Sequence, residues 1–412
     1  MTKGTMQSSA LQLVLFEALD GDAAGAGRTA KDLQSNLIAL YDVAPKYVFA
    51  SYASRDGGRS SAMAGGRSTE VAAERTGFIP SVAREFTYRG STFGLTIQPA
   101  RLSRIAEDVA PGEVPKLVEF EVFPAEREQV VEQVVRRLAM DRSRLRLSGE
   151  KRDQVQMRFS LLEIKRELRA VGHTLATDEI KEALTILARS RIIITPVDAS
   201  SRKGRPMHLL ESTTFPVLVI RQPTGGEDEG ETYLQFNPLV ADAIRKLEFK
   251  PVSYHWLMRL KSPTSRWLYN YLSAEYDVAG LADEDGARAV TLSADQIVRN
   301  SGMNVWSRLR DTLRAVTAAV DALVDEGILD GVEKVYQKTG NRIDDIEYVM
   351  VPSRRFLDQM HHSNTVQRAN VATAKAVTGS DESPRGFVPV SPGQAMDVRR
   401  RRANLLNGPA GD

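Results

Sequence analysis

The sequence predicts an α+β fold, mainly helical, with two tandem winged-helix domains between a weakly ordered N-terminal extension and a disordered C-terminal tail. The clearest signal is a capping box formed by Ser293 and Gln296 at the start of a short helix. Gly302 breaks that helix, a longer one begins near Asn304, and two candidate strands follow. This order is typical of a helix-turn-helix with a wing. A similar order occurs once before, between residues 125 and 221.

Composition limits the classes of protein that this chain can belong to. With 412 residues, 42% of them hydrophobic, the chain can bury the cores of about two or three domains. The net charge is only +2, so any affinity for DNA must come from clustered basic residues. The absence of cysteine excludes disulfides, thiolate chemistry and cysteine-based zinc fingers. There is no apolar run of membrane-spanning length, and we expect a cytoplasmic protein without membrane contact.

Residues 1–117 form the N-terminal extension. Gly, Ala, Ser and Arg dominate from Gly21 to Thr76 apart from the stretch from Leu33 to Ala53, so we expect most of the first 75 residues to be weakly ordered. Between residues 86 and 97, alternating apolar residues around Arg89 and Gly90 predict two short strands joined by a turn.

The first predicted winged helix covers residues 118–235. We expect a helix over 125–140, followed by a helix that Ser160 and Glu163 open with a capping box. A third helix, capped by Thr177, has acidic residues close to its start, where a helix that reads bases would usually have neutral or basic ones. We therefore expect this unit to position the protein rather than to specify the site.

The wing of this first unit is predicted to pair strands 192–195 and 217–220. The intervening loop carries Arg202, Lys203 and Arg205, which suit contacts with phosphates or a minor groove. A solvated hairpin tip is the alternative interpretation of the same residues.

The second predicted winged helix covers residues 236–360. Asn237 and Pro238 open its first helix as a cap and a first-position proline. The last helix should run from Val305 to Asp325, because apolar residues recur along it at spacings of three and four. Beyond Met360 the apolar pattern fades, so residues 361–412 are predicted to be a disordered basic tail that could still contact DNA.

The polar face of the Val305 helix is the best candidate for reading DNA. Arginine can form a bidentate pair of hydrogen bonds with guanine, and asparagine can hydrogen-bond adenine. A helix N-terminus favours phosphate. An ordinary solvated helix face is the alternative, and the capped helix, the Gly302 turn and the basic wing favour DNA. The candidate residues of this unit are Asn304, Ser307, Arg308, Arg310 and Arg314 on the helix, with Lys338 and Arg342 at the wing tip.

Motifs for catalysis are missing from the sequence. The five histidines include no His-hydrophobic-His triplet, and no Gly-x-x-x-x-Gly-Lys-Ser/Thr loop is present. We therefore predict a protein that is not an enzyme and has no cofactor or metal. The three tryptophans, Trp256, Trp267 and Trp306, fall within apolar patterns and are predicted to be core residues.

Residues 118–355 resemble plasmid replication initiators of the tandem winged-helix type. The resemblance lies in the order of capped helices, the two winged units and the Trp267-Leu-Tyr-Asn-Tyr-Leu272 helix after Lys261-Ser-Pro263. It implies binding of double-stranded DNA at repeated origin sites and recruitment of host replication proteins such as the helicase. It also implies a possible homodimer that forms through the first winged helix and represses the protein's own promoter. Two other functions remain open: a transcriptional repressor or partition-associated adaptor with the same DNA-binding surface, and a scaffold whose winged helices bind protein.

Overall fold

The structure is a computed structural model. It describes residues 34–49, 70–71, 79–105, 117–141, 144–148, 154–197, 209–220, 231–246, 248–276, 282–283, 286–287 and 289–378. The helices are α2 (Ala39–Val43), α3 (Glu126–Leu138), α4 (Leu161–Ala170), α5 (Thr177–Arg189), α6 (Pro238–Arg245), α7 (Tyr254–Arg259), α8 (Pro263–Glu275), α9 (Ala294–Ser301), α10 (Leu309–Asp325) and α11 (Arg354–Thr378).

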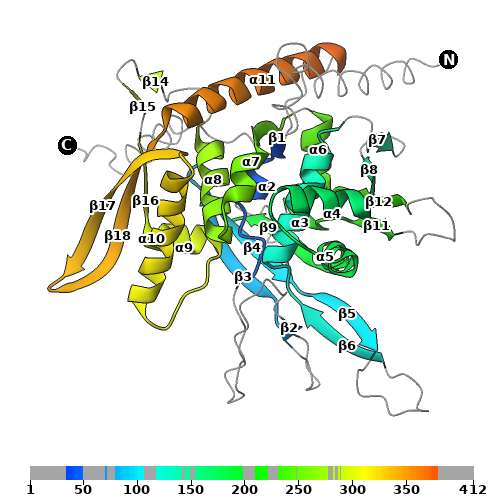
Figure 1. Cartoon of the computed structure of the whole chain (residues 1–412), viewed down its shortest axis with the longest axis horizontal. Coiled ribbons are helices and arrows are strands. Elements are labelled where there is room, and N and C mark those ends of the chain that lie inside the picture. Colours follow the sequence, from blue (N-terminus) through cyan, green and yellow to red (C-terminus); the bar gives the residue numbers. More distant parts are fainter. Residues whose placement is uncertain are drawn as a thin grey trace, which may run out of the picture.

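The strands are β1 (Gln34–Leu37), β2 (Glu70–Val71), β3 (Val82–Tyr88), β4 (Ser91–Gln98), β5 (Ala100–Ile105), β6 (Leu117–Val122), β7 (Leu145–Ser148), β8 (Gln154–Ser160), β9 (Arg191–Pro196), β10 (Leu210–Thr213), β11 (Val217–Ile220), β12 (Glu231–Gln235), β13 (Lys250–Ser253), β14 (Ala282–Asp283), β15 (Gly286–Ala287), β16 (Val290–Ser293), β17 (Leu329–Thr339) and β18 (Arg342–Pro352). Within the described residues these strands form six sheets, so the α+β class is confirmed (Figure 1). The strand content is higher than in the mainly helical fold that we expected. Short strands of mixed polarity, such as β10 and β12, do not show the alternating apolar pattern by which a strand is predicted from sequence.

The second half of the chain is organised around a three-stranded antiparallel sheet of order β16–β18–β17. Between β16 and β17 lie α9 and α10, and the long β17–β18 hairpin extends away from the body beside α10 (Figure 1). The predicted capping box opens α9: Ser293 Oγ accepts from Gln296 N at 3.1 Å, and Gln296 Oε1 accepts from Ser293 N at 2.9 Å. This end of the helix is therefore fixed by local sequence.

The first half repeats this order of elements, with β9 and β10 inserted after the second helix. The strand β8 leads into α4 and α5, and it lies in a sheet of order β11–β12–β8–β7. The strands β8, β12 and β11 therefore correspond to β16, β18 and β17. The capping box is repeated at the same place, because Ser160 Oγ accepts from Glu163 N at 3.2 Å and Glu163 Oε2 accepts from Ser160 N at 2.8 Å. Thr177 is not the expected cap: it is the first residue of α5, and Ala176 is the N-cap.

The strand pairing predicted for the first wing is wrong. The strand β9 pairs with β10 and β4, whereas β11 pairs with β12 in a different sheet. The segments 192–195 and 217–220 are the most apolar strands of this region, but their true partners β10 and β12 are more polar and did not stand out. The hairpin that corresponds to β17–β18 is thus β11–β12, while residues 202–205 lie between β9 and β10, outside the described residues.

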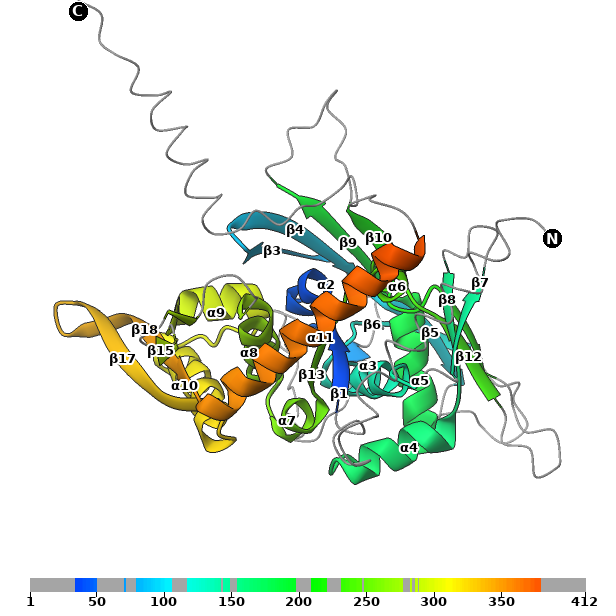
Figure 2. The same cartoon turned by 90° about the horizontal axis from the view of Figure 1, so that it is seen from above.

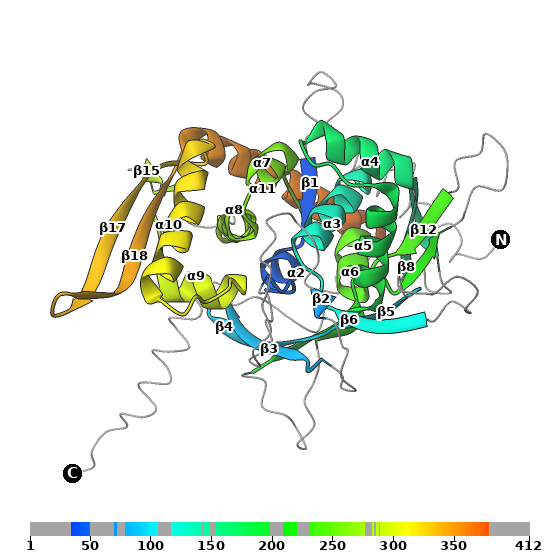
Figure 3. The ribbon, with the colours of Figure 1, turned by 60° about the horizontal axis from the view of Figure 1, so that its bottom comes forward.

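The described part of the N-terminal extension belongs to the core. The turn at Arg89 and Gly90 joins β3 and β4 as predicted, but β4 continues the sheet of β9 and β10 instead of forming a separate element. The strand β1 pairs with β13, and α2 packs between α8 and α3 (Figure 3). Residues 34–49 are thus firmly packed, whereas the rest of the segment expected to be weakly ordered, apart from 70–71, lies outside the described residues.

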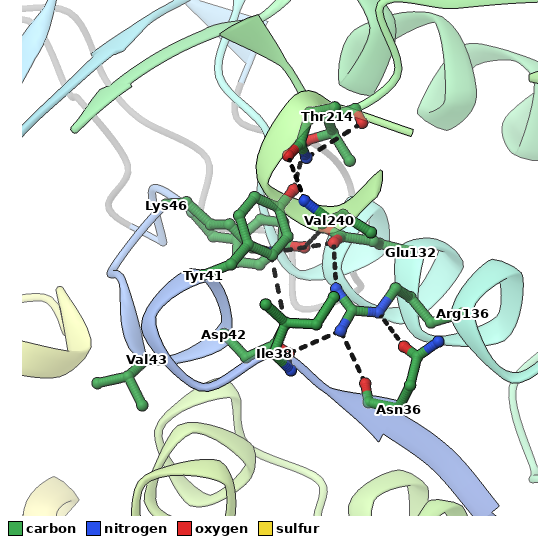
Figure 4. Close-up of polar contacts among 12 residues, drawn as sticks. Asn36, Ile38, Tyr41, Asp42, Val43, Lys46, Glu132, Arg136, Thr214 and Val240 are labelled. Atoms are coloured by element: carbon green, nitrogen blue, oxygen red, sulfur yellow. Dashed lines mark hydrogen bonds and ion pairs between the residues drawn. The ribbon is translucent and has the colours of Figure 1, made fainter. Parts of the chain in front are cut away.

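A buried network of charges holds this N-terminal segment against α3 (Figure 4). Arg136 Nη2 lies 2.7 Å from Asp42 Oδ2, and Lys46 Nζ lies 3.0 Å from Glu132 Oε1. Burial lowers the pKa of Lys46. Burial alone would raise the pKa of Glu132, but the neighbouring Lys46 and Arg136 reverse that effect and lower it. Two cations therefore balance two anions, which is the condition under which charges can be buried without a large loss of stability.

The segment 361–378, expected to be part of the disordered tail, is helical. It belongs to α11, which runs from the end of β18 across β13 (Figure 2). Phe356 and Met360 are buried near its start, but further along its buried face is polar. Asn364 Nδ2, for example, donates to the carbonyl oxygen of Tyr276 at 3.0 Å. The apolar pattern in the sequence therefore fades beyond Met360 although the helix continues. Residues 379–412, which include Arg399–Arg402, lie outside the described residues.

Candidate nucleic-acid interface

The turn before α10 is longer than the sequence indicated. Gly302 ends α9 in the left-handed region with φ of 66°, and α10 begins at Leu309 instead of at Val305. Trp306 N donates to Thr312 Oγ1 at 3.1 Å, which ties this turn to the first turn of the helix. Val305 extended the apolar stripe by its spacing alone, yet its side chain is 67% exposed, so its burial does not stabilise a further helical turn.

The candidate residues that precede α10 therefore do not share one helix face with those on it. Asn304 and Ser307 lie in the turn, and Arg308 is the N-cap of α10, without a side-chain capping bond. Ser307 and Arg308 are exposed, and Asn304 is partly buried. The turn and the first turns of α10 nevertheless form a continuous segment that carries all five of these candidates.

Arginines dominate the exposed surface at the start of α10. Arg308 and Arg310 are exposed and have no ion pair within the described residues. Arg314 is 79% exposed and lies 3.2 Å from Asp311. An exposed pair of this kind contributes at most about 1 kcal/mol, so the arginine can exchange it for a stronger partner. Together with the partial positive charge of the helix N-terminus, these side chains make this end of α10 attractive to anions.

The far end of α10 has the opposite character. Asp321 is held 2.9 Å from Lys334 on β17, and Glu326 is held 2.7 Å from Arg259. Asp325 is exposed. Anionic groups at this end would repel phosphate, so any contact with nucleic acid is confined to the N-terminal half of α10.

The β17–β18 hairpin adds a second basic surface. Lys338 and Arg342 are both exposed beside Gly340, which turns the chain at the tip with φ of 62°. Arg342 has one weak contact, at 3.5 Å from Asp344. The hairpin and α10 lie side by side in Figures 1 and 3, so the tip and the helix could contact one elongated ligand. The corresponding candidates of the first unit, Arg202, Lys203 and Arg205, lie outside the described residues.

The helix α5, which corresponds to α10 in the first half, is less open. One side is covered by the β5–β6 hairpin, where Ile186 is fully buried against Leu102, Phe120 and Val122. Its own charges are engaged as well: Glu182 lies 2.6 Å from Arg127, and Lys181 lies 3.1 Å from Asp178. The acidic start and the covered side both make α5 a poor surface for an anionic ligand.

Sequence reasoning misplaced one aromatic residue at this surface. Trp256 and Trp267 are core residues, each 4% exposed, whereas Trp306 is 43% exposed in the turn before α10. Tyr336 on the hairpin is 50% exposed and was not singled out either. The position of Trp306 directly after a helix-ending glycine was the available signal that it belongs to a turn.

The part of the chain that the structure describes holds no cluster of three or more His, Asp or Glu side chains suited to a metal ion. No described helix combines the length and the apolar character needed to cross a bilayer.

Comparison with solved structures finds low-identity similarities. Domains 2 and 3 of RctB match with 7% identity and a TM-score of 0.38, covering 67% of this chain and 92% of that one. A Pi initiator protein in complex with iteron DNA matches with 15% identity and a TM-score of 0.34, covering 48% of this chain and 82% of that one. A further structure of RctB domains 2–3 matches with 6% identity and a TM-score of 0.37, over 70% and 96% of the two chains.

No family model matches this chain, and no curated protein matches it. The similar solved structures include an initiator protein, the class that the sequence resembles.

Proposed function

We propose that this protein initiates plasmid replication by sequence-specific binding of duplex DNA at repeated origin sites, and that it acts without catalysis of its own. The observation that carries the proposal is the exposed arginine surface at the start of α10, where Arg308 and Arg310 have no ion pair within the described residues and Arg314 has only an exposed pair with Asp311. This surface follows a helix-ending glycine and is flanked by a basic hairpin. A helix N-terminus with arginines suits the edges of guanine in a major groove.

In this proposal residues 290–352 form a winged helix. Its support is the sheet order β16–β18–β17, with α9 and α10 inserted between the first two strands in sequence. Arg310 and Arg314 read bases, while Lys338 and Arg342 at the hairpin tip contact phosphates. Asn304, Ser307 and Arg308 lie before the helix and contact the backbone or the first base pair of the site.

We propose that the first unit, in residues 118–235, is also a winged helix and serves for positioning and dimerisation. The repeated capping box at Ser160 and the matching sheet order support the repeat. The covered side of α5 favours a role other than reading bases. Arg202, Lys203 and Arg205 would contribute phosphate contacts, and recruitment of host replication proteins would supply the strand opening.

Selection of bound sequences from a random duplex library tests the proposal. Full-length protein is used at near-physiological salt, because nonspecific phosphate binding is weak there. We expect one enriched motif that recurs as direct repeats beside an AT-rich segment in the source replicon. A lone inverted repeat over a promoter would favour the repressor or partition-associated adaptor instead. Absence of any enriched motif would overturn DNA reading and favour a scaffold that binds protein.

A further inference from the structure

An apolar patch is exposed in the turn that leads into α10. Val305 is 67% exposed, Trp306 is 43% exposed, and Leu309 at the start of the helix is 36% exposed. Three large apolar side chains within five residues of one another are unusual for an exposed turn, since exposed apolar side chains usually occur singly. The two other tryptophans of the chain are buried, so the exposure of Trp306 is not a general feature of this residue type here.

The patch is held in place rather than left on a loose loop. Trp306 N is bonded to Oγ1 of Thr312, which is itself buried on α10. At the other end of the turn, Asn300 Oδ1 accepts from Thr87 N of β3 at 3.0 Å. Both ends of the turn are therefore anchored to packed elements, which lowers the entropy lost when a ligand contacts it.

The surroundings of the patch indicate what covers it. Arg308 lies between Trp306 and Leu309 in sequence, and Arg310 follows directly, both exposed and without an ion pair in the described residues. The ligand must therefore be strongly anionic and still offer apolar groups within a few ångströms of its charges. Duplex DNA meets both requirements, because thymine places a methyl group in the major groove between the two phosphate backbones.

We propose that Trp306, with Val305, contacts thymine methyl groups in the major groove and makes thymine the preferred base beside the pairs that Arg310 reads. This inference rests on the proposed function, because it places α10 in a major groove. It assigns the apolar part of the recognition to the turn and the polar part to the helix.

Tryptophan fluorescence gives the first test, since Trp306 is the one exposed tryptophan of the three. The probe is the full chain with and without the duplex obtained by selection, titrated with acrylamide. We expect the accessible fraction of the emission to fall when the duplex is bound, and Trp306→Phe to remove that accessible fraction. An emission that stays equally quenchable in a saturated complex would overturn the inference.

Replacement of thymine by uracil in the selected duplex gives the second test, because it deletes only the methyl group. We expect the wild-type chain to bind about fourfold more weakly for each contacted methyl. Trp306→Ala should lose part of this sensitivity, and the double variant Val305→Ala, Trp306→Ala should bind thymine and uracil duplexes equally. An unchanged melting temperature would show that the fold of each variant is intact. Equal sensitivity in the wild type and the double variant, or insensitivity of the wild type, would overturn the inference.

The two hypotheses fail in different ways. A chain that enriches no motif contradicts the proposed function and this inference together. A chain that binds a selected duplex specifically, with Trp306 still quenchable and uracil tolerated, contradicts this inference alone.

Discussion

The guanidinium of Arg84, on β3, fills the space that a side chain at Gly302 would occupy. Arg84 Nη1 donates to the carbonyl oxygens of Pro45 and Tyr47, each at 2.7 Å. The N-terminal segment, the β3–β4 hairpin and the turn after α9 thus meet at one point. The position of the turn that leads into α10 is therefore set by residues more than two hundred positions earlier in the chain.

Gly302→Ala should destabilise the protein through both backbone strain and this contact. The residue has φ of 66°, and an added Cβ would lie 2.9 Å from Pro45 Cβ and would displace Arg84. Gly340→Ala is the matched control, because its φ is 62° and nothing lies within 4 Å of the added atom. Left-handed strain alone costs about 1–2 kcal/mol. Urea unfolding should give a larger loss for Gly302→Ala than for Gly340→Ala, and equal losses would contradict the contact.

Arg136→Met should reduce the free energy of unfolding by about 3–5 kcal/mol, because it leaves Asp42 and Glu132 buried with Lys46 as their remaining cation. Arg354→Met removes an exposed arginine whose pair with Asp358 spans 3.2 Å, and it should cost no more than about 1 kcal/mol. Denaturant midpoints measure both variants. A small effect of Arg136→Met would mean that the network does not hold the N-terminal segment in place.

Stability should fall as the pH is lowered through the titration of His173. Burial lowers the pKa of this histidine below its ordinary value of 6.5, and the nearby Arg266 lowers it further. The unfolded chain therefore takes up the proton at a higher pH than the folded chain, so acidification favours unfolding below about pH 6.5.

Melting temperatures between about pH 7 and about pH 5 check this expectation. His173→Gln should flatten the decline, whereas the matched change His361→Gln, at an exposed position on α11, should leave it unchanged. If His173→Gln and the wild type decline in parallel, the lowered pKa is not the cause.

Local signals in the sequence predicted local structure well. The capping boxes at Ser160 and Ser293, the cap at Asn237 and the turn at Gly302 all appear in the structure, because each depends on residues within one helical turn. The same locality explains the error at Val305. Val305 lies four residues before Leu309, which is a helical spacing. Whether a helical turn forms there depends on core contacts that the spacing does not reveal.

Non-local structure was harder to predict. The pairing of β9 with β4 joins segments about a hundred residues apart, and the packing of residues 34–49 depends on a charge balance between Asp42, Lys46, Glu132 and Arg136. In the sequence, the buried charged residues and the polar residues on the buried face of α11 cannot be distinguished from residues exposed to solvent. The candidate arginines were found because exposed charge on a helix can be read from spacing, whereas the exposure of Trp306 could not.

In the proposed function, Arg310 and Arg314 on α10 read a DNA sequence. The most direct measurement compares binding of the selected duplex and of a scrambled duplex by the wild type and by the double variant Arg310→Ala, Arg314→Ala. Arg166→Ala with Arg169→Ala removes the same charge from exposed positions on α4 and serves as the control.

Each lost bidentate base contact is worth roughly 1–3 kcal/mol, so we expect the α10 double variant to lose its preference for the selected duplex while it keeps its melting temperature. The α4 control should keep that preference. An α10 double variant that still prefers the selected duplex as strongly as the wild type does would contradict the assignment of α10 as the reading helix.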